Sequence, residues 1–140
     1  MSKVAIVYFS STGNTEQMAF AVEEGAKSAD LEVDTFAVSD ASALNPAEYD
    51  GFALGCSAMG NEELDEGEFR PFFEGILPEL KDKKVVLFGS YGWGDGEWMR
   101  SWQKECEDAG VTLATDPVIA NDAPDDEARA NCEALGKSLA

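Results

Sequence analysis

Six consecutive residues near the N-terminus have the side chains and the setting to bind a phosphate group. The run Ser10-Ser11-Thr12-Gly13-Asn14-Thr15 follows the apolar stretch 4–9, which predicts a buried strand. After it, small and apolar residues recur at helical spacing, on a face formed by Met18, Ala21, Val22, Gly25, Ala26 and Ala29. A loop between a strand and a helix offers an anion free backbone N–H groups and the positive end of the helix dipole.

The loop contains no lysine or arginine, which separates it from two other phosphate-binding motifs. A P-loop uses a lysine on the β- and γ-phosphates of a nucleoside triphosphate, and the dinucleotide fingerprint needs three glycines. Residues 10–15 therefore suit one terminal phosphate, held by hydroxyl and amide groups. The competing interpretation is an ordinary strand-to-helix turn whose serines and threonines only cap the helix.

The stretch Met59-Gly60-Asn61-Glu62 is a second candidate. Gly60 and Asn61 both tolerate the positive φ angles of type II and type II′ turns, so their shared peptide could turn either its carbonyl or its N–H toward a ligand. Met59 has a polarizable side chain suited to packing on an aromatic face. The alternative is an ordinary Gly-Asn hairpin turn.

A third candidate is the glycine-rich, aromatic stretch Ser90-Tyr91-Gly92-Trp93-Gly94-Asp95-Gly96. An aromatic ring between glycines usually stacks on a ligand or partner, because its neighbours supply no periodic packing. Asp95 either contacts a ligand or caps the following helix, and the cap is the preferred interpretation. Trp98 and Trp102 lie four residues apart on a predicted helix face, where we expect them in the core.

The elements that must position these stretches alternate between strands and helices. After the first strand and helix, four more strands and three more helices are predicted: strands at 31–36, 51–56, 85–89 and from 111–114 toward 119, and helices from Phe69 to Pro71 onward, around 98–109 before Gly110, and after Pro124. This pattern predicts one α/β domain over residues 1–140, a doubly wound, five-stranded parallel sheet with helices on both faces. Ligands of such sheets bind beyond the carboxyl ends of the strands, where all three candidate loops fall.

Composition excludes several classes of function. The chain has 28 acidic and 10 basic residues, a formal net charge of −18 and no histidine. Nucleic acid and anionic membranes would be repelled, whereas basic protein partners would be attracted. The lack of histidine excludes triad hydrolysis and histidine-ligated zinc. We expect no metal site, and the acidic run Asp122, Asp125, Asp126 and Glu127 is interpreted as the first turn of the last helix.

Cysteine usage and hydropathy indicate where the protein works. Cys56, Cys106 and Cys132 lie in apolar patterns without a CxxC spacing, which indicates buried reduced thiols. No apolar run approaches the length of a membrane span, and the N-terminus lacks the basic and apolar blocks of a signal peptide. We therefore expect a cytoplasmic protein, and a monomer.

Together the three loops predict a binding site for one phosphate beside a site lined by aromatic side chains. Such a pair of sites suits a flat heterocycle on a phosphate chain, and flavin mononucleotide (FMN) fits best. The sequence also resembles the short-chain flavodoxins. Residues 10–15 match that family's FMN-phosphate loop, Gly55-Cys56-Ser57-Ala58-Met59-Gly60 the first flavin loop, and 87–94 the second. The resemblance spans essentially the whole chain, and it implies the strand order 2-1-3-4-5 with FMN at the switch point between the first and third strands.

The resemblance also implies roles for single residues. Met59 and Trp93 would cover opposite faces of the isoalloxazine ring, Glu62 would reach its N3–H, and the Gly60 carbonyl would accept N5–H in the one-electron-reduced state. Asn61 and Ser11 stand where relatives often carry Asp and Gly. The implied cofactor-binding set is Ser10, Ser11, Thr12, Gly13, Asn14, Thr15, Ser57, Ala58, Met59, Gly60, Asn61, Glu62, Ser90, Tyr91, Gly92, Trp93, Gly94 and Asp95.

The expected function is low-potential one-electron transfer by an electron-transfer protein that is not an enzyme. Bound FMN would shuttle between semiquinone and hydroquinone and reduce protein partners. The expected partners are redox proteins with basic docking surfaces, namely reductases and low-potential electron acceptors. One like charge about 10 Å from the anionic hydroquinone costs roughly 1.5 kcal/mol at an effective dielectric constant near 20, or about 65 mV.

The alternatives to an electron carrier are a quinone reductase using a nicotinamide cofactor and a cofactor-free signalling domain. The second needs carboxylates for Mg²⁺ at the ends of early strands, yet the first strand ends in Phe9-Ser10.

Overall fold

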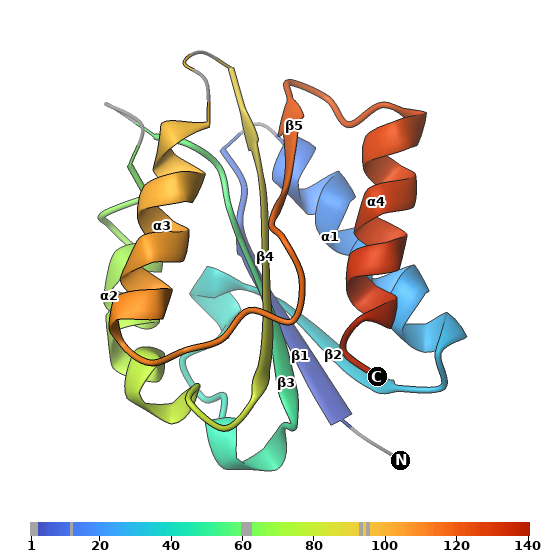
Figure 1. The fold of residues 1–140 in the computed structure, drawn as a ribbon. Helices are drawn as coiled ribbons and strands as arrows, with labels where there is room; N and C mark the ends of the chain where they lie inside the picture. The colour runs from blue at the N-terminus through green and yellow to red at the C-terminus, as the bar shows by residue number, and fades with distance from the viewer. Residues whose placement is uncertain (1–2, 12, 60–62, 93, 95) are drawn as a thin grey trace.

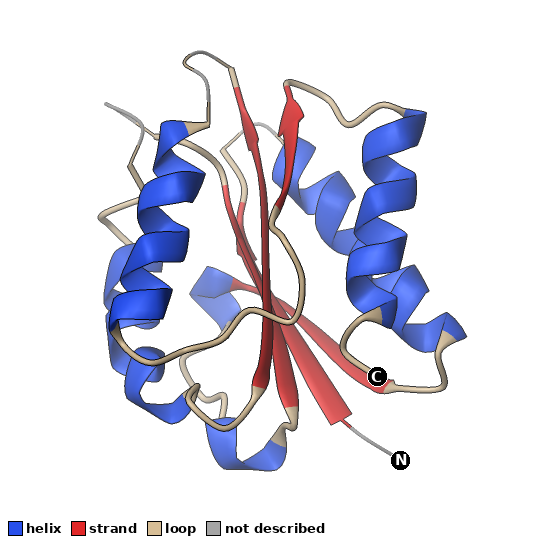
Figure 2. Cartoon of the chain, in the orientation of Figure 1, coloured by secondary structure: helices blue, strands red, loops and turns tan. Residues whose placement is uncertain are grey.

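A parallel sheet forms the centre of the protein, and helices cover both of its faces (Figure 1, Figure 2). The computed structural model describes residues 3–11, 13–59, 63–92, 94 and 96–140. The strands are β1 (Lys3–Phe9), β2 (Glu32–Ala37), β3 (Gly51–Cys56), β4 (Lys84–Tyr91) and β5 (Val118–Asn121). The helices are α1 (Asn14–Ser28), α2 (Phe69–Ile76), α3 (Glu97–Asp108) and α4 (Asp126–Lys137).

The strand order is β2-β1-β3-β4-β5, and all four pairings are parallel. This confirms the doubly wound, single-domain fold and the order 2-1-3-4-5. All six residues of β3, in the middle of the sheet, are buried, whereas no residue of the edge strand β2 is fully buried. The apolar run of β3 and the alternating sequence of β2 reflect these two positions in the sheet.

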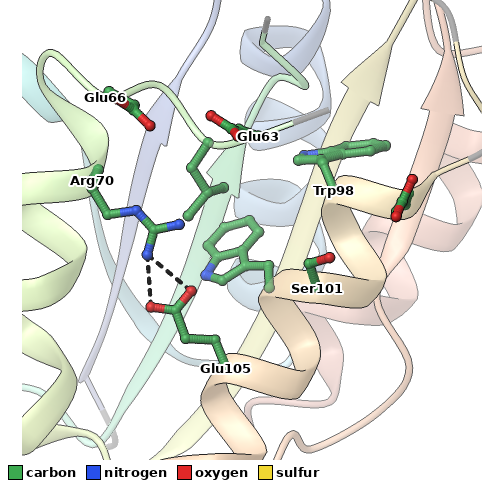
Figure 3. Close-up of a pocket in the computed structure, with 9 residues that line it drawn as sticks. Glu63, Glu66, Arg70, Trp98, Ser101 and Glu105 are labelled. Atoms are coloured by element: carbon green, nitrogen blue, oxygen red, sulfur yellow. Dashed lines mark hydrogen bonds and ion pairs between the residues drawn. The ribbon is translucent and has the colours of Figure 1, made fainter. Parts of the chain in front are cut away.

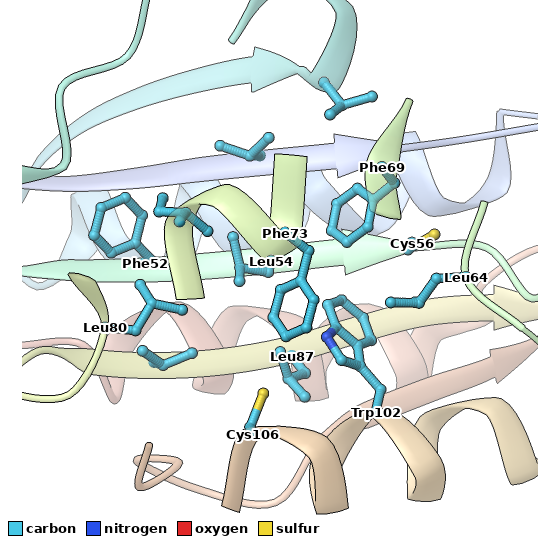
Figure 4. Close-up of a cluster of buried hydrophobic side chains, with 14 of the residues drawn as sticks. Phe52, Leu54, Cys56, Leu64, Phe69, Phe73, Leu80, Leu87, Trp102 and Cys106 are labelled. Atoms are coloured by element: carbon cyan, nitrogen blue, oxygen red, sulfur yellow. The ribbon is translucent and has the colours of Figure 1, made fainter. Parts of the chain in front are cut away.

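Each face of the sheet has its own layer of helices and its own core. The helices α1 and α4 cover one face, over a core that includes Val4, Ile6, Met18 and Cys132. The helices α2 and α3 cover the other, over a core that includes six buried aromatic residues: Tyr49, Phe52, Phe69, Phe73, Trp98 and Trp102. Figure 4 shows four of them, Phe52, Phe69, Phe73 and Trp102. Trp98 and Trp102 are each 1% exposed, which confirms their predicted place in the core.

Two strand predictions were wrong in their bounds. The strand β4 continues through Tyr91, so Ser90 and Tyr91 belong to the sheet and not to the loop after it. The fifth strand was predicted to begin at 111–114, but only Leu113 there forms an isolated bridge, to Val85, and β5 begins at Val118. Pro117, which has no N–H to donate, immediately precedes the paired residues of β5.

The predicted helix ends and thiols agree with the structure. Asp125 caps α4, since its side chain accepts a hydrogen bond from the Ala128 N–H at 2.8 Å, and Asp126 and Glu127 lie in the first turn, as predicted. Asp122 was wrongly included in that turn, because it directly follows β5 and its N–H donates to the Tyr91 carbonyl oxygen. Gly110 follows α3 at the predicted stop. All three cysteines are free and buried, and burial raises the pKa of each thiol to about 12.

Candidate functional site

The loops that follow β1, β3 and β4 meet at one edge of the sheet (Figure 1). The three strands are adjacent and parallel, so their carboxyl ends share this edge. Backbone hydrogen bonds join the loops: the Ser57 N–H donates to the Phe9 carbonyl oxygen at 3.2 Å, and the Ala58 N–H to the Ser90 carbonyl oxygen at 3.0 Å. The structure thus brings together stretches that lie far apart in the sequence.

Twelve of the predicted cofactor-binding residues lie at this edge: Ser10, Ser11, Gly13, Asn14, Thr15, Ser57, Ala58, Met59, Ser90, Tyr91, Gly92 and Gly94. The other six, Thr12, Gly60, Asn61, Glu62, Trp93 and Asp95, lie outside the described residues. Their roles, including the preferred capping role of Asp95, stay predictions from the sequence.

The turn before α1 keeps two amide groups open. Gly13 is the N-cap residue, with φ at 93°, a left-handed conformation that suits glycine. Ser10 Oγ accepts hydrogen bonds from the Gly13 N–H at 3.0 Å and the Glu16 N–H at 3.2 Å. The amides of Asn14 and Thr15 have no protein acceptor within the described parts of the chain. An anion at this helix end would meet two free N–H donors and the positive end of the helix dipole.

Three buried hydroxyl groups link the three loops. Among the described residues, the buried polar side chains are those of Thr15, Ser57 and Ser90. Thr15 Oγ1 lies 2.8 Å from Ser57 Oγ and accepts a hydrogen bond from the Ser90 N–H at 3.1 Å. Ser57 Oγ in turn donates to the Phe9 carbonyl oxygen at 3.5 Å. A buried polar group that loses its partner costs about 1–3 kcal/mol, so this network fixes the loops relative to one another.

The stretch around Met59 has hydrogen-bonded flanks. Met59 and Glu63 form an antiparallel bridge, in which each N–H donates to the other residue's carbonyl oxygen at 2.8 Å. Met59 and Glu63 therefore pair with each other, as the two flanks of a hairpin do. The peptide between Gly60 and Asn61, for which the sequence suggested two orientations, lies outside the described residues.

The end of β4 differs from the exposed aromatic loop that the sequence suggested. Tyr91 is partly buried, and its ring lies 5.4 Å from the Trp98 ring at an interplanar angle of 48°. The Ser90 hydroxyl donates to the Asp122 carbonyl oxygen at 2.7 Å, and its N–H and carbonyl are bonded to Thr15 and Ala58. All three polar groups of Ser90 thus have protein partners, which makes Ser90 a residue that holds the loops together.

Sequence reasoning missed a fourth segment at this edge, the residues that follow β5. The Asp122 N–H donates to the Tyr91 carbonyl oxygen at 2.8 Å, and Asn121 Nδ2 lies 3.4 Å from the same oxygen. The signal was available, because the carboxyl end of a fifth parallel strand must reach the same edge. The strand was predicted to begin too early, at 111–114, and although it was extended toward Ile119, the residues after its carboxyl end were not counted among the candidate loops.

A basic residue beyond the three loops also lies nearby. Arg70, in the first turn of α2, forms two hydrogen bonds to Glu105 of α3, at 2.6 and 2.9 Å, across a hollow of about 410 Å³ that Glu63 and Glu66 also line (Figure 3). The hydrogen bonds to Glu105 raise the pKa of Arg70, so the guanidinium stays charged. The hollow nevertheless has more carboxylates than cations.

The described residues contain neither a candidate metal-binding cluster nor a candidate membrane-spanning helix. Within the described residues, no cluster of histidine, cysteine, aspartate and glutamate side chains could hold a metal ion. None of the helices in those residues is both long enough and apolar enough to cross a bilayer.

The fold and the site define a class: a doubly wound α/β protein whose carboxyl edge is built for a phosphate-bearing ligand. Comparison with known proteins gives the family. The family model described as flavodoxin matches residues 6–135. The chain is 44% identical to a flavodoxin of Megasphaera elsdenii over 98% of each chain, and 45% identical to one of Clostridium beijerinckii over 96% of this chain and 97% of that one. The solution structure of two-electron reduced M. elsdenii flavodoxin superposes with a TM-score of 0.87 at 45% identity, covering 97% of each chain.

This chain therefore belongs to the flavodoxin family, as the loops predicted. Flavodoxins are FMN-binding electron-transfer proteins and not enzymes, so the quinone reductase and the cofactor-free signalling domain are both set aside. The open amides of Asn14 and Thr15 and the nearby hydroxyl of Ser10 fit the phosphate of FMN.

Proposed function

We propose that this chain is a low-potential one-electron carrier that shuttles bound FMN between the semiquinone and hydroquinone states and reduces protein partners. The observation that carries the proposal is the charge around the carboxyl edge. The described parts of the three loops contain no basic side chain, while Glu16, Glu63 and Glu66 lie in or beside them. A negative charge added to the cofactor is disfavoured there, which makes the fully reduced form a strong reductant.

The cofactor would be held in two parts. The phosphate binds at the start of α1, to the amides of Asn14 and Thr15 and to hydroxyl groups of residues 10–15. By the family resemblance, the stretches 57–62 and 90–95 would hold the ring, with Met59 and Trp93 toward its faces and Glu62 toward N3–H. FMN would supply the one-electron chemistry, and the Gly60 carbonyl would accept a hydrogen bond from N5–H.

A reductive titration tests this function. The purified chain is loaded with FMN and reduced stepwise with dithionite under anaerobic conditions, while the visible spectrum is recorded. We expect a blue neutral semiquinone to accumulate near half reduction, and a second one-electron step at a much lower potential. Direct conversion to the two-electron-reduced form, without the intermediate, contradicts the proposal.

The partners would be redox proteins, reductases and low-potential acceptors, that present basic docking surfaces. A net charge of −18 attracts such surfaces and raises association rates, and salt screens this attraction. A basic c-type cytochrome serves as the probe. Its reduction by the FMN-loaded chain should slow at least about tenfold between 20 and 500 mM salt. A rate independent of salt contradicts electrostatic docking.

A matched pair of variants locates the docking surface. Glu66→Gln removes a carboxylate beside the hollow near the site, and Glu107→Gln removes one on α3 away from the carboxyl edge. We expect Glu66→Gln to slow reduction of the cytochrome more than Glu107→Gln does.

Cytoplasmic location and a monomeric state stay predictions from the sequence. Light scattering on the loaded chain tests the monomeric state.

A further inference from the structure

The first turn of α1, beside the amides expected to bind the phosphate of FMN, contains a glutamate, Glu16. Gly13 is the N-cap residue, so Glu16 is the third residue of the helix. In a capping box, a glutamate at this position folds back and accepts a hydrogen bond from the N-cap N–H. Glu16 therefore has an intrinsic alternative conformation, in which its carboxylate occupies the helix N-terminus.

Two contacts oppose that conformation. In a capping box the Gly13 N–H would donate to the glutamate, but here it donates to Ser10 Oγ at 3.0 Å. The Glu16 carboxylate accepts a hydrogen bond from the Tyr8 hydroxyl at 2.8 Å. Tyr8 lies near the carboxyl end of β1 and is 8% exposed, so its ring is fixed in the core beneath α1.

The protonation state of Tyr8 favours its hydrogen bond to Glu16. Burial and the neighbouring Glu16 and Asp40 carboxylates raise the pKa of Tyr8 to about 12. The phenol therefore keeps its proton and remains a donor. A hydrogen bond in which the acceptor is charged is stronger than a neutral one, so it can restrain a partly buried glutamate.

We propose that Tyr8 is a positioning residue for the cofactor site: it holds the Glu16 carboxylate away from the N-terminal amides of α1, so that these amides stay open to the phosphate of FMN. This inference rests on the proposed FMN function. It adds to that function an internal competitor, Glu16, and the residue that restrains it. Neither residue belongs to the three loop motifs that the sequence analysis assigned to the cofactor, although Glu16 directly follows the first.

Two flavins separate this role from a structural one. Riboflavin has the same ring as FMN but no phosphate, so it does not use the amides of Asn14 and Thr15. Tyr8→Phe removes only the hydroxyl. We expect it to weaken FMN binding about tenfold, since a hydrogen bond to a charged group is lost, and to change riboflavin binding less than twofold. Dissociation constants come from the quenching of flavin fluorescence.

A double-mutant cycle tests whether Tyr8 acts through Glu16. Glu16→Ala removes the competitor and should strengthen FMN binding several-fold, and Tyr8→Phe in that background should have less than a twofold effect. Glu24→Ala is the charge control, because Glu24 is exposed on the same helix about 12 Å further along its axis. It should change FMN binding less than twofold.

Three results would overturn the inference. Tyr8→Phe could weaken FMN and riboflavin equally, which indicates a general structural effect, and urea unfolding of the variants checks that they fold. The Tyr8→Phe effect could persist in the Glu16→Ala background. Glu24→Ala could match Glu16→Ala, which indicates a net-charge effect. If the wild-type chain binds neither flavin, both this inference and the proposed function fail, whereas the three results above leave the function intact.

Discussion

The two helices of each layer pack against each other, but the contact is made by backbone in one layer and by aromatic side chains in the other. Between α1 and α4 the backbones nearly touch: a Cβ atom on Gly25 would lie 1.9 Å from the Glu133 carbonyl oxygen, and one on Gly136 would lie 2.1 Å from that of Val22. Between α2 and α3 aromatic rings fill the space. The Trp102 ring meets the Phe69 and Phe73 rings edge-on, at centroid distances of 5.4 and 5.8 Å.

This difference corresponds to what each layer supports at the carboxyl edge. The helix α1 begins at the phosphate loop, and contact of its backbone with α4 leaves it little freedom to shift. The helices α2 and α3 follow the two stretches proposed to hold the flavin ring. Their packing is made of side chains, which adjust by rotamer changes more readily than a backbone contact does. We infer that the phosphate end of the site is the more rigid one.

The largest expected effect concerns the aromatic layer. Phe73→Ala removes a fully buried ring that packs on Trp102 and should lower the free energy of unfolding by about 4 kcal/mol. Urea unfolding at a fixed FMN concentration measures it. The matched control is Phe20→Ala on α1, where the ring is 50% exposed and the cost should stay below about 0.5 kcal/mol. Equal costs would show that aromatic filling does not hold this layer.

The second prediction concerns the glycine contact. Gly25→Ala places a methyl group against the backbone of α4, which cannot move aside as a side chain can, and should destabilise the chain by about 3 kcal/mol. The control is Gly75→Ala on α2, where a Cβ meets nothing within 4 Å. Helix propensity should make that variant more stable by about 0.5–1 kcal/mol. A neutral Gly25→Ala in the same urea experiment would mean that α1 and α4 can separate without cost.

The two layers were not equally predictable from sequence. The apolar face of α2 can be identified from the sequence, because large residues at helical spacing, such as Phe69, Phe73 and Ile76, can only be buried together. The α1 face was also identified, including Gly25, but a glycine in a helical pattern gives no sign of what it touches. Its partner is a carbonyl of α4, more than a hundred residues away, and such a contact depends on the tertiary structure alone.

The site shows the same division. The phosphate loop follows from local rules, since a turn of Ser, Thr, Gly and Asn before a helix leaves amides free whatever surrounds it. The role of Ser90 does not follow from local sequence, because its partners Thr15, Ala58 and Asp122 come from three other segments. Tyr8 and Glu16 were likewise missed, although a glutamate three residues after Gly13 is a helix-start signal.

The third prediction tests the hydroxyl network that joins the three loops. Thr15→Val keeps the shape of the side chain but leaves the buried Ser90 N–H without its acceptor, at a cost of about 2 kcal/mol in the free energy of unfolding. Thr15→Ser keeps the hydroxyl and should cost well below half of that. If both variants unfold at the same urea concentration, the methyl group contributes as much as the hydroxyl, which contradicts a special role for the hydroxyl network.

The smallest expected effect of a single residue is the alkaline destabilisation that each buried thiol contributes, and it also compares the two layers directly. Burial raises the pKa of all three thiols from 9.0 to about 12, so the folded chain keeps its thiols neutral while the unfolded chain ionises them. This stability is fully present below pH 9 and is lost between pH 9 and 12. Each thiol should contribute a loss of about 1.4 kcal/mol between pH 8 and pH 10.

The thiols are divided unequally between the layers. Cys56 and Cys106 lie in the core under α2 and α3, and Cys132 lies in the other. Comparing urea unfolding at pH 8 and pH 10, Cys132→Ala should therefore reduce the alkaline loss by about 1.4 kcal/mol and Cys56→Ala/Cys106→Ala by about twice as much. Each alanine also leaves a cavity, but that cost is the same at both pH values and cancels in the difference. Equal reductions in the two variants would mean that one layer opens before its thiols ionise, and would contradict cooperative unfolding of the two layers.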